Sequence, residues 1–345
     1  MATNHPNPTA APPPHVQVIQ MGTGYWVSRA LYAAAKLGLA DKLASGPRSA
    51  AELAKETSTL PSALHRLMRL LAGLGMLKTE RDGQRFALTP LGEAMKSDAP
   101  GAARATILTL AGPMFWKAFG EYMYSLETGK TGFEKAFEMP VFDYLAKHPE
   151  DAANFVQTMI GVHGDEPPTI VAAYDFSGVG TVVDVGGSSG NLLEAILKRY
   201  PGPRGVLFDL PHVVRDAPQR FRAWGLGDRI RAEGGSFFES VPAGGDAYIL
   251  SHVIHDWSEE QCLTILGNCR RAMKPDAKLL IVEMVIPAGD EMHPGKLLDL
   301  TMLVMPGGQE RTEAEYAALL DKAGFRLTRV VSTQSNVSVV EAVKR

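Results

Sequence analysis

The sequence predicts an α/β protein in which a doubly wound, mostly parallel sheet follows a mostly helical N-terminal domain. After Gly178, short apolar runs alternate with amphipathic segments, a rhythm typical of parallel strands joined by crossover helices. Before residue 100, apolar residues recur mainly at helical spacing. With 345 residues and 45% hydrophobic content, the chain is long enough for two domains with a core each.

Three helical segments followed by a short hairpin are expected in the N-terminal domain. Ser49 and Glu52 have the spacing of a capping box that opens a helix. Asp82-Gly83 fits the turn between two short strands. This order, ending near residue 100, is a winged-helix pattern, and residues 1–14 predict a disordered tail and no signal peptide. The expected elements are helices at 15–44, from Ser49 onward and at 58–74, and strands at 76–79 and 85–88.

The second domain, residues 101–345, contains the predicted sheet. Residues 101–175 have helical periodicity, with Gly and Pro breaks and many Met and aromatic residues. Five apolar runs then predict parallel strands, and two more, on either side of Gln334-Ser335-Asn336, predict a closing hairpin. The expected strands are 182–185, 205–208, 229–232, 247–250, 278–283, 327–331 and 337–343. The expectation is therefore a seven-stranded sheet with an antiparallel C-terminal hairpin.

Composition narrows the classes of partner. A formal net charge of −3 lacks the basic excess of a protein built to bind nucleic acid. No apolar run approaches the roughly 20 residues that span a bilayer, so no membrane segment is expected. Cys262 and Cys269 are the only cysteines and lie in an expected helix. We therefore expect no disulfide and a cytoplasmic location.

A glycine-rich turn follows the first expected strand of the sheet. Residues 182–191 read Val-Val-Asp-Val-Gly-Gly-Ser-Ser-Gly-Asn and lead from a buried strand into a helix. Glycine allows a tight turn and close approach of a ligand, and doubly wound sheets bind nucleotide-like ligands at such strand ends. Asp209, at the end of the next strand, suits the hydroxyls of a ribose. The alternative is that the turn is only structural.

Two nucleotide-like ligands compete for this turn, a dinucleotide and S-adenosylmethionine. The dinucleotide spacing G-x-G-x-x-G is not met, because Gly186, Ser188 and Asn191 occupy its three positions. S-adenosylmethionine has no pyrophosphate to bind. The motif therefore favours the sulfonium cofactor.

A second polar segment, Ser251 to Trp257, follows the fourth expected strand. His255 would lie at the same edge of the sheet as the glycine-rich turn. An imidazole can remove a proton from a hydroxyl, and a carboxylate can fix its tautomer; either Glu283 or Glu310 could serve. The alternative is that His255 caps the strand and the carboxylates pair with Arg or Lys. His252 is expected on the same side of the strand, deeper, in a structural role.

In this order, these motifs resemble the plant caffeic-acid and isoflavone type of O-methyltransferase and its bacterial relatives. The resemblance covers nearly all of the chain, from the Tyr25 region to the C-terminus. It implies a Rossmann-like class I methyltransferase behind a winged-helix dimerisation domain, with S-adenosylmethionine converted to S-adenosylhomocysteine and no metal. The matching strings are Asp184–Gly190, Phe208–His212, Gly234–Pro242, His255–Trp257 and Gly307–Thr312.

The resemblance also implies roles position by position. His255 falls on the catalytic base, flanked by Glu283 and Glu310. Ser236 stands where the plant enzymes carry Asp and can still accept a hydrogen bond from the adenine amino group, whereas Ser251 replaces a cofactor-contacting lysine. The implied cofactor contacts are Asp184, Gly186, Gly187, Gly190, Asp209, Leu210, Gly235, Ser236, Phe237, Ser251 and Trp257.

A homodimer and a hydroxylated aromatic acceptor are further implications of the resemblance. The first helical segment, residues 15–30, would reach the partner's active site. The helix at 58–74 offers only His65, Arg66 and Arg69, which favours dimer packing over DNA binding. A planar acceptor suits a pocket rich in Met and aromatic residues, although plain core packing is the alternative. The implied lining residues are Phe115, Trp116, Phe155, Met159, His163, Met302 and Met305.

We therefore predict in-line transfer of a methyl group to a hydroxyl, with His255 removing the acceptor proton. No paired Asp motif and no Cys/His spacing predicts metal ligands. Two rival functions stay open. One is a relative that binds the same cofactor but catalyses hydroxylation or a pericyclic reaction, and the other is a ligand-sensing regulator that uses the winged helix on DNA.

Overall fold

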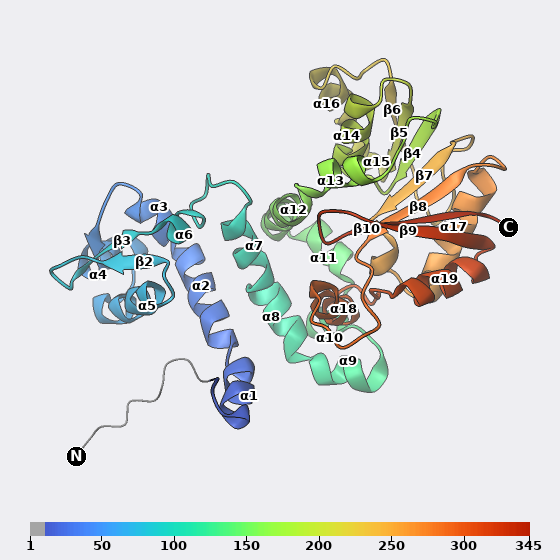
Figure 1. Ribbon diagram of the computed structural model, residues 1–345. Coiled ribbons are helices and arrows are strands. Elements are labelled where there is room, and N and C mark those ends of the chain that lie inside the picture. The colour runs from blue at the N-terminus through green and yellow to red at the C-terminus, as the bar shows by residue number, and fades with distance from the viewer. Residues whose placement is uncertain (1–10) are drawn as a thin grey trace. The chain divides into compact units, whose positions relative to one another are not determined.

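The computed structural model describes residues 11–345, so most of the tail expected at 1–14 lies outside the described residues. The chain forms two compact units (Figure 1). The first comprises residues up to 116 together with 148–162, and the second comprises 117–147 together with 163–345. Within the described part of the chain, no helix is long and apolar enough to cross a membrane.

The first unit has the expected winged-helix order. The helical segment expected at 15–44 is three helices, because the chain turns at Thr23-Gly24 and again at Gly38, whose φ of +62° suits glycine. The capping box of Ser49 and Glu52 is confirmed. The helices are α1 (Pro14–Gly22), α2 (Tyr25–Leu37), α3 (Leu39–Leu43), α4 (Ala50–Thr57), α5 (Pro61–Gly73), α6 (Pro90–Glu93) and α7 (Ala103–Leu110), while α8 (Pro113–Gly120) and α12 (Pro149–His163) cross the boundary of the unit.

A three-stranded antiparallel sheet in the order β1-β3-β2 forms the wing. β2 (Leu77–Thr79) and β3 (Arg85–Leu88) are the expected hairpin. β1 (Arg48–Ser49) is an additional strand, and its two residues carry no periodicity of their own. Met68 and Phe86 are buried where the helices meet this sheet.

The first unit extends beyond the domain boundary expected near residue 100. In α7, the Arg104 guanidinium donates to the carbonyl of Ala35 at 3.1 Å and pairs with Asp41 at 2.9 Å. Thr158 of α12 donates to the hydroxyl of Thr109 at 2.9 Å, and both are buried. These contacts join residues beyond 100 to the winged-helix core.

The second unit is built on the predicted seven-stranded sheet, in the order β6-β5-β4-β7-β8-β10-β9. The first five strands in this order are parallel, and β10 pairs antiparallel with both β8 and β9, which confirms the closing hairpin. The strands are β4 (Thr181–Val185), β5 (Arg204–Asp209), β6 (Ile230–Gly234), β7 (Ala247–Ser251), β8 (Lys278–Glu283), β9 (Phe325–Ser332) and β10 (Ser338–Lys344).

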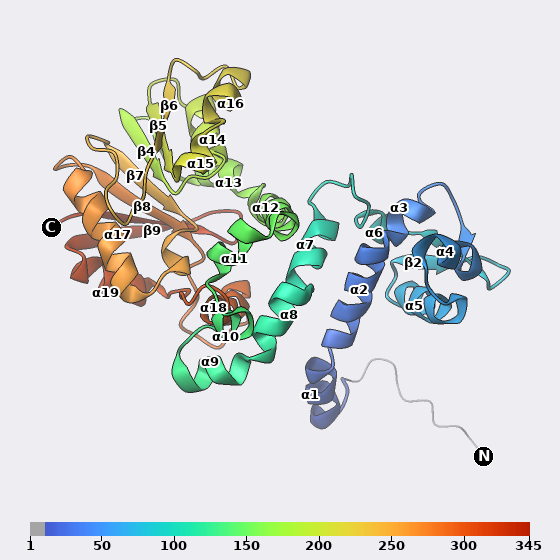
Figure 2. The same ribbon diagram turned by 180° about the vertical axis from the view of Figure 1, so that it is seen from behind.

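Alternation along the strands sends neighbouring residues to two different cores. Val183 and Tyr248 pack with α17 (Glu259–Ala272) and α19 (Glu313–Lys322) on one face (Figure 2). Val182 and Ile249 pack with helices on the other face. The remaining helices of this unit are α9 (Tyr122–Thr128), α10 (Gly132–Phe137), α11 (Val141–Lys147), α13 (Glu166–Ala173), α14 (Asn191–Arg199), α15 (Pro211–Val214), α16 (Ala217–Ala223) and α18 (Pro294–Val304).

The carboxyl edge of the sheet gathers the polar motifs. The order of strands reverses between β4 and β7, which is the position where doubly wound sheets bind ligands. Gly186, Asp209, Ser251 and Glu283 follow or end β4, β5, β7 and β8, so all four lie at this edge.

Candidate active site

His255 lies in a tight turn after β7. The strand ends at Ser251, and a short 3-10 helix, η1 (Ile254–Asp256), reverses the chain. Gly308 approaches this turn so closely that a Cβ there would lie 1.8 Å from the carbonyl oxygen of His255. The Gln309 N–H donates to the same carbonyl at 2.8 Å. The turn is thus fixed by the backbone of the segment that also carries Glu310.

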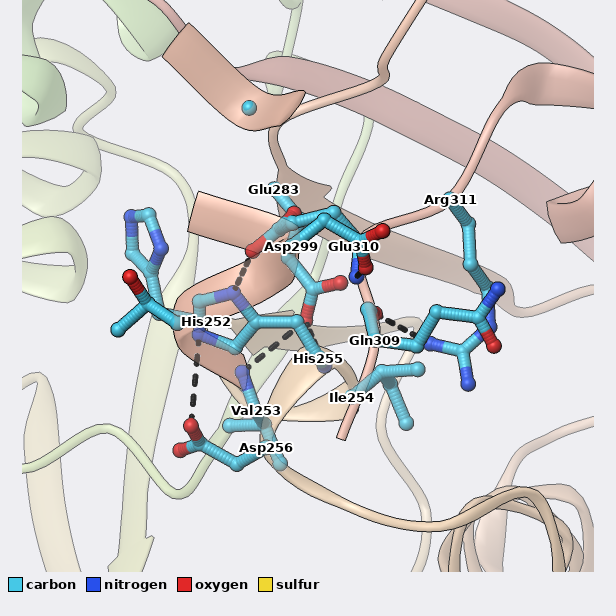
Figure 3. Close-up of polar contacts among 12 residues, drawn as sticks. His252, Val253, Ile254, His255, Asp256, Glu283, Asp299, Gln309, Glu310 and Arg311 are labelled. Carbon is cyan, nitrogen blue, oxygen red and sulfur yellow. Dashed lines mark hydrogen bonds and ion pairs between the residues drawn. The ribbon is translucent and has the colours of Figure 1, made fainter. Parts of the chain in front are cut away.

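Glu310 and Asp256 approach opposite nitrogens of the His255 ring (Figure 3). His255 Nδ1 donates to Glu310 Oε1 at 2.6 Å, and both residues are buried. Asp256 Oδ1 lies 3.8 Å from Nε2. Because a carboxylate can only accept, the Glu310 contact keeps a proton on Nδ1 and leaves Nε2 as the nitrogen able to take up another.

Glu283 lies beside His255 but contacts its backbone, and within the described residues it makes no hydrogen bond or ion pair with the imidazole. Its Oε1 accepts the backbone N–H groups of Val253 and His255, each at 3.1 Å (Figure 3). The Tyr316 hydroxyl donates to Glu283 Oε2. Glu283 therefore fixes the backbone of the turn, and Glu310 fixes the ring.

The electrostatics of this turn favour a proton on His255. Burial lowers the pKa of His255, but the charge of Asp256 and the hydrogen bond to Glu310 outweigh burial and raise that pKa to about 10. Burial also raises the pKa of Asp256 to about 6 and raises the pKa of Glu310. The imidazolium is therefore the stable form of His255, and a ring that has lost its Nε2 proton can accept one from a weakly acidic group.

His252 departs from strand geometry. Because β7 ends one residue earlier and His252 has a φ of +52°, the expected placement deeper on the same side of the strand is wrong. Its Nε2 is bonded to Glu166 at 2.7 Å, and no hydrogen bond joins its ring to His255 within the part of the chain that the structure describes.

The glycine-rich turn after β4 has the geometry of a ligand cradle. The N–H of Gly186 donates to the carbonyl of Phe208 at 2.8 Å, which ties the turn to the end of β5. Asp209 accepts the N–H of Ser188 at 2.9 Å and of Leu210 at 2.7 Å. Both side-chain oxygens of the carboxylate are thereby oriented at the carboxyl edge, where a ribose would lie.

Space at this cradle requires glycine. Gly186 has a φ of +73°, and a Cβ there would lie 2.9 Å from Val253. A Cβ on Gly235 would lie 2.8 Å from the Phe208 ring, and one on Gly187 would lie 2.5 Å from the Asp184 carboxyl carbon. The backbone is therefore open only because these positions have no side chain.

Asp184 is buried beneath the turn, and neither of its oxygens has a hydrogen-bond partner within the described residues. Burial and the charge of Asp209 raise its pKa to about 7. A cation bound near this carboxylate would be stabilised by it.

The other predicted cofactor residues gather at the same edge. The Phe237 ring packs edge-on against Trp257, with centroids 5.9 Å apart, and its carbonyl accepts a bond from Asn268 at 2.7 Å. Ser236 Oγ already accepts the N–H of Phe238 at 3.3 Å, a competing contact that the sequence did not predict. Leu210 is 45% exposed, and Gly190, with φ +81°, precedes α14.

The residues predicted to line the acceptor pocket are divided between the two units. Phe115, Trp116, Phe155 and Met159 belong to the first unit, whereas His163, Met302 and Met305 belong to the second. Within the second unit, both methionines are buried in or next to α18, and His163 is bonded to Glu166.

Three residues of this region were missed by sequence reasoning. Tyr316 anchors Glu283, Asp299 accepts the Glu310 N–H at 2.9 Å, and Glu166 joins two histidines. The signal for Glu166 was its position two residues after Gly164 and directly before Pro167-Pro168, at the start of a helix. Tyr316 and Asp299 carry no local motif.

Comparison with known proteins agrees with this geometry. Residues 116–326 match the family model of the O-methyltransferase domain, and residues 19–98 match that of the O-methyltransferase dimerisation domain. The phenazine O-methyltransferase of Lysobacter antibioticus is 45% identical over 325 residues, which are 94% of this chain and 95% of the relative. The phenazine-1-carboxylate N-methyltransferase of Pseudomonas aeruginosa is 34% identical over 332 residues, 95% of this chain and 96% of the relative.

A solved structure matches over both units. It is the O-methyltransferase of neocarzinostatin biosynthesis in complex with S-adenosylmethionine and 2-hydroxy-5-methyl naphthoic acid. It matches with a TM-score of 0.82 and 33% identity, covering 92% of this chain and 96% of that one. The dimerisation model over residues 19–98 supports the dimer interpretation of the winged helix over the DNA-binding one. The chain belongs to the O-methyltransferase family of S-adenosylmethionine-dependent methyltransferases.

Proposed function

We propose that this protein transfers the methyl group of S-adenosylmethionine to a phenolic hydroxyl, with His255 as general base. The observation that carries the proposal is the 2.6 Å contact of His255 Nδ1 with the buried Glu310. It fixes the tautomer whose Nε2 can take the acceptor proton. Glu310 is the residue that orients the ring, and Glu283 acts on the backbone.

A phenol matches this base better than an alcohol does. The pKa of a phenol is about 10, close to the raised pKa of about 10 for His255. Proton transfer between two groups of similar pKa is nearly balanced in free energy, so the oxygen can gain charge as it attacks the methyl carbon. The 2-hydroxy-5-methyl naphthoic acid bound to the solved relative is a hydroxylated aromatic molecule.

Hydroxyl specificity needs its own argument, because an N-methyltransferase is 34% identical to this chain. An amine attacks through its neutral lone pair and loses its proton afterwards, whereas a phenol gains most from losing its proton during attack. A buried base with a fixed tautomer therefore favours the hydroxyl. The same His255–Glu310 contact argues against a family member that binds the cofactor without transferring methyl.

The residues of the cradle would hold S-adenosylmethionine, whose sulfonium supplies the electrophilic methyl group. Asp209 would accept the ribose hydroxyls, and the open backbone at Gly186 and Gly187 would allow the ligand close to β4. Asp184 would favour the positive charge of the cofactor. Phe237 and Trp257 provide apolar surface beside the turn. The proposed chemistry requires no metal.

We also propose a homodimer formed through the first unit. Helix α1 exposes Val18, Ile19 and Met21, at 64%, 60% and 74%, which a monomer would leave in water. A cytoplasmic location fits Cys262 and Cys269, which are both free thiols.

The test is a screen of phenols and matched anilines with S-adenosylmethionine, scored by formation of S-adenosylhomocysteine and of the methylated product. We expect O-methylated products, and we expect His255→Asn to lower turnover by about 10²–10⁴-fold. Affinity for S-adenosylhomocysteine, measured by calorimetry, is the control and should stay unchanged. Equal turnover by His255→Asn and wild type would remove His255 from the mechanism, and products methylated only at nitrogen would overturn the hydroxyl assignment.

A further inference from the structure

Two histidines share one carboxylate next to the proposed active site, within the second unit. Glu166 is the first residue of α13, His163 is the last residue of α12, and His252 follows β7. His163 Nδ1 lies 3.1 Å from Glu166 Oε1, and His252 Nε2 lies 2.7 Å from Glu166 Oε2. The two rings are tilted by 39° to each other, and their centroids lie 3.9 Å apart. The fold thus brings His252 next to Glu166, although the two residues are 86 positions apart in the sequence.

No lysine or arginine among the described residues balances the negative charge of Glu166 in this cluster. Glu166 is only 7% exposed, and across residues 11–345 its ion pairs are with the two histidines and with no Lys or Arg. A buried carboxylate is costly unless a positive charge lies beside it. Imidazoles are ordinarily neutral near pH 7, so the charge must be balanced by a proton on one ring or by a bound cation.

The ligand chemistry matches a borderline transition metal. One candidate ligand atom of each residue lies within 4.8 Å of the other two. Zinc binds imidazole nitrogen and carboxylate oxygen at about 2.0–2.2 Å, which places the ligands of a tetrahedral site roughly 3.3 Å apart. His163 Nδ1 lies 3.1 Å from one oxygen of Glu166 and His252 Nε2 lies 2.7 Å from the other, and both distances are near this separation. Two imidazoles and one carboxylate leave a fourth position for water.

The backbone of His252 turns its ring toward this cluster. Its φ of +52° is a conformation that residues with a side chain rarely adopt, and its N–H donates to the Val282 carbonyl at 3.1 Å. Nδ1 of the same ring is buried and has no hydrogen-bond partner among the described residues. The polar contact of this ring is therefore the one that Nε2 makes with Glu166. His163 is 21% exposed at its side chain, which leaves a path for an ion from solvent.

We propose that His163, Glu166 and His252 form a binding site for a divalent transition metal of the zinc class. The metal takes no part in methyl transfer. It replaces the two His–Glu hydrogen bonds with metal–ligand bonds and joins the start of α13 to the turn after β7. The proposal does not rest on the proposed methyl transfer, because its readout is metal binding.

The test uses the full-length, tag-free protein after treatment with a chelator. Titration with Co²⁺, which reports its coordination through visible absorption, and with Zn²⁺ by calorimetry should show one site per chain. We expect Glu166→Gln and, separately, the more exposed His163→Asn to weaken binding by on the order of 100-fold or more. His212→Asn, an exposed histidine outside the cluster, is the matched control and should bind as wild type does.

A thermal melt of each variant guards against misfolding. Zinc should raise the melting temperature of wild type and of His212→Asn, because a ligand that binds only the folded state stabilises it. It should not raise that of a folded Glu166→Gln or His163→Asn variant. Absence of a stoichiometric site in wild type, or binding retained in either cluster variant, would overturn the proposal.

Discussion

Replacing Asp184 with Asn should stabilise the protein at neutral and alkaline pH. The carboxyl group is 1% exposed and its two oxygens have no partner within the described residues, so its ionised form is costly. Its folded-state pKa is about 7, against an ordinary value of 3.8. A raised pKa means that stability is highest when the group is protonated and falls as pH rises from about 4 to about 7.

The magnitude follows from the two pKa values. A difference of about 3 units corresponds to roughly 4 kcal/mol once the pH exceeds 7. Between pH 5 and pH 8 the cost of ionising Asp184 grows by about 2–3 kcal/mol. Asn has nearly the same shape and no charge, so the variant should not show this loss.

Urea unfolding at several pH values between 5 and 8 measures the effect. From pH 5 to pH 8, the free energy of unfolding of Asp184→Asn should rise by about 2–3 kcal/mol relative to that of wild type. The same variant should bind S-adenosylmethionine more weakly, since a negative charge beneath the turn would be lost. A difference between the two proteins that does not change with pH would refute the assignment of a raised pKa to Asp184.

Four other changes test the environment of His255. Glu310→Gln should lower turnover by on the order of 100-fold with cofactor affinity unchanged, measured by steady-state kinetics and calorimetry, because a neutral amide stabilises the imidazolium less. Tyr316→Phe should cost about 1–3 kcal/mol of stability in urea unfolding, since Glu283 would keep one buried oxygen without its donor; an unchanged midpoint would contradict this. Gly308→Ala should lower turnover more than it lowers cofactor affinity, because its Cβ would meet the His255 carbonyl. In wild type, kcat/KM should rise with pH toward about 10, where His255 loses its proton, and a rate that is flat from pH 7 to 10 would argue against the raised pKa.

Local patterns predicted the elements well, because periodicity and capping are read over a few residues. β8 at Lys278–Glu283 and β3 at Arg85–Leu88 have the predicted bounds, and the Ser49–Glu52 capping box is present. β1 was missed because two residues become a strand only by pairing with β3. The break between α1 and α2 near Thr23 was not predicted, because no proline marks it in the sequence.

Which side chains contact each other in the site depends on the tertiary structure, and a single sequence does not show this. His255 and Glu310 were both predicted, but their separation of 55 positions left open which carboxylate would meet the ring. Glu283 accepts backbone N–H groups instead, a contact that any residue other than proline at 253 and 255 could make. The left-handed φ of His252 likewise depends on where β7 ends and not on the identity of the side chain.

The turn that carries His255 is surrounded by buried acids, and this arrangement explains how an imidazole can act on a phenol. Glu283 and Glu310 are each 0% exposed, and Asp256 faces the second nitrogen of the ring. Three carboxylates near one imidazole are tolerable only when that ring bears a proton, so the fold stabilises the imidazolium before any acceptor arrives. Because proton uptake by His255 accompanies attack on the methyl carbon, the same charges are complementary to the transition state. The cost appears in the resting enzyme, in which the base must first lose a proton, and this is why activity should rise with pH.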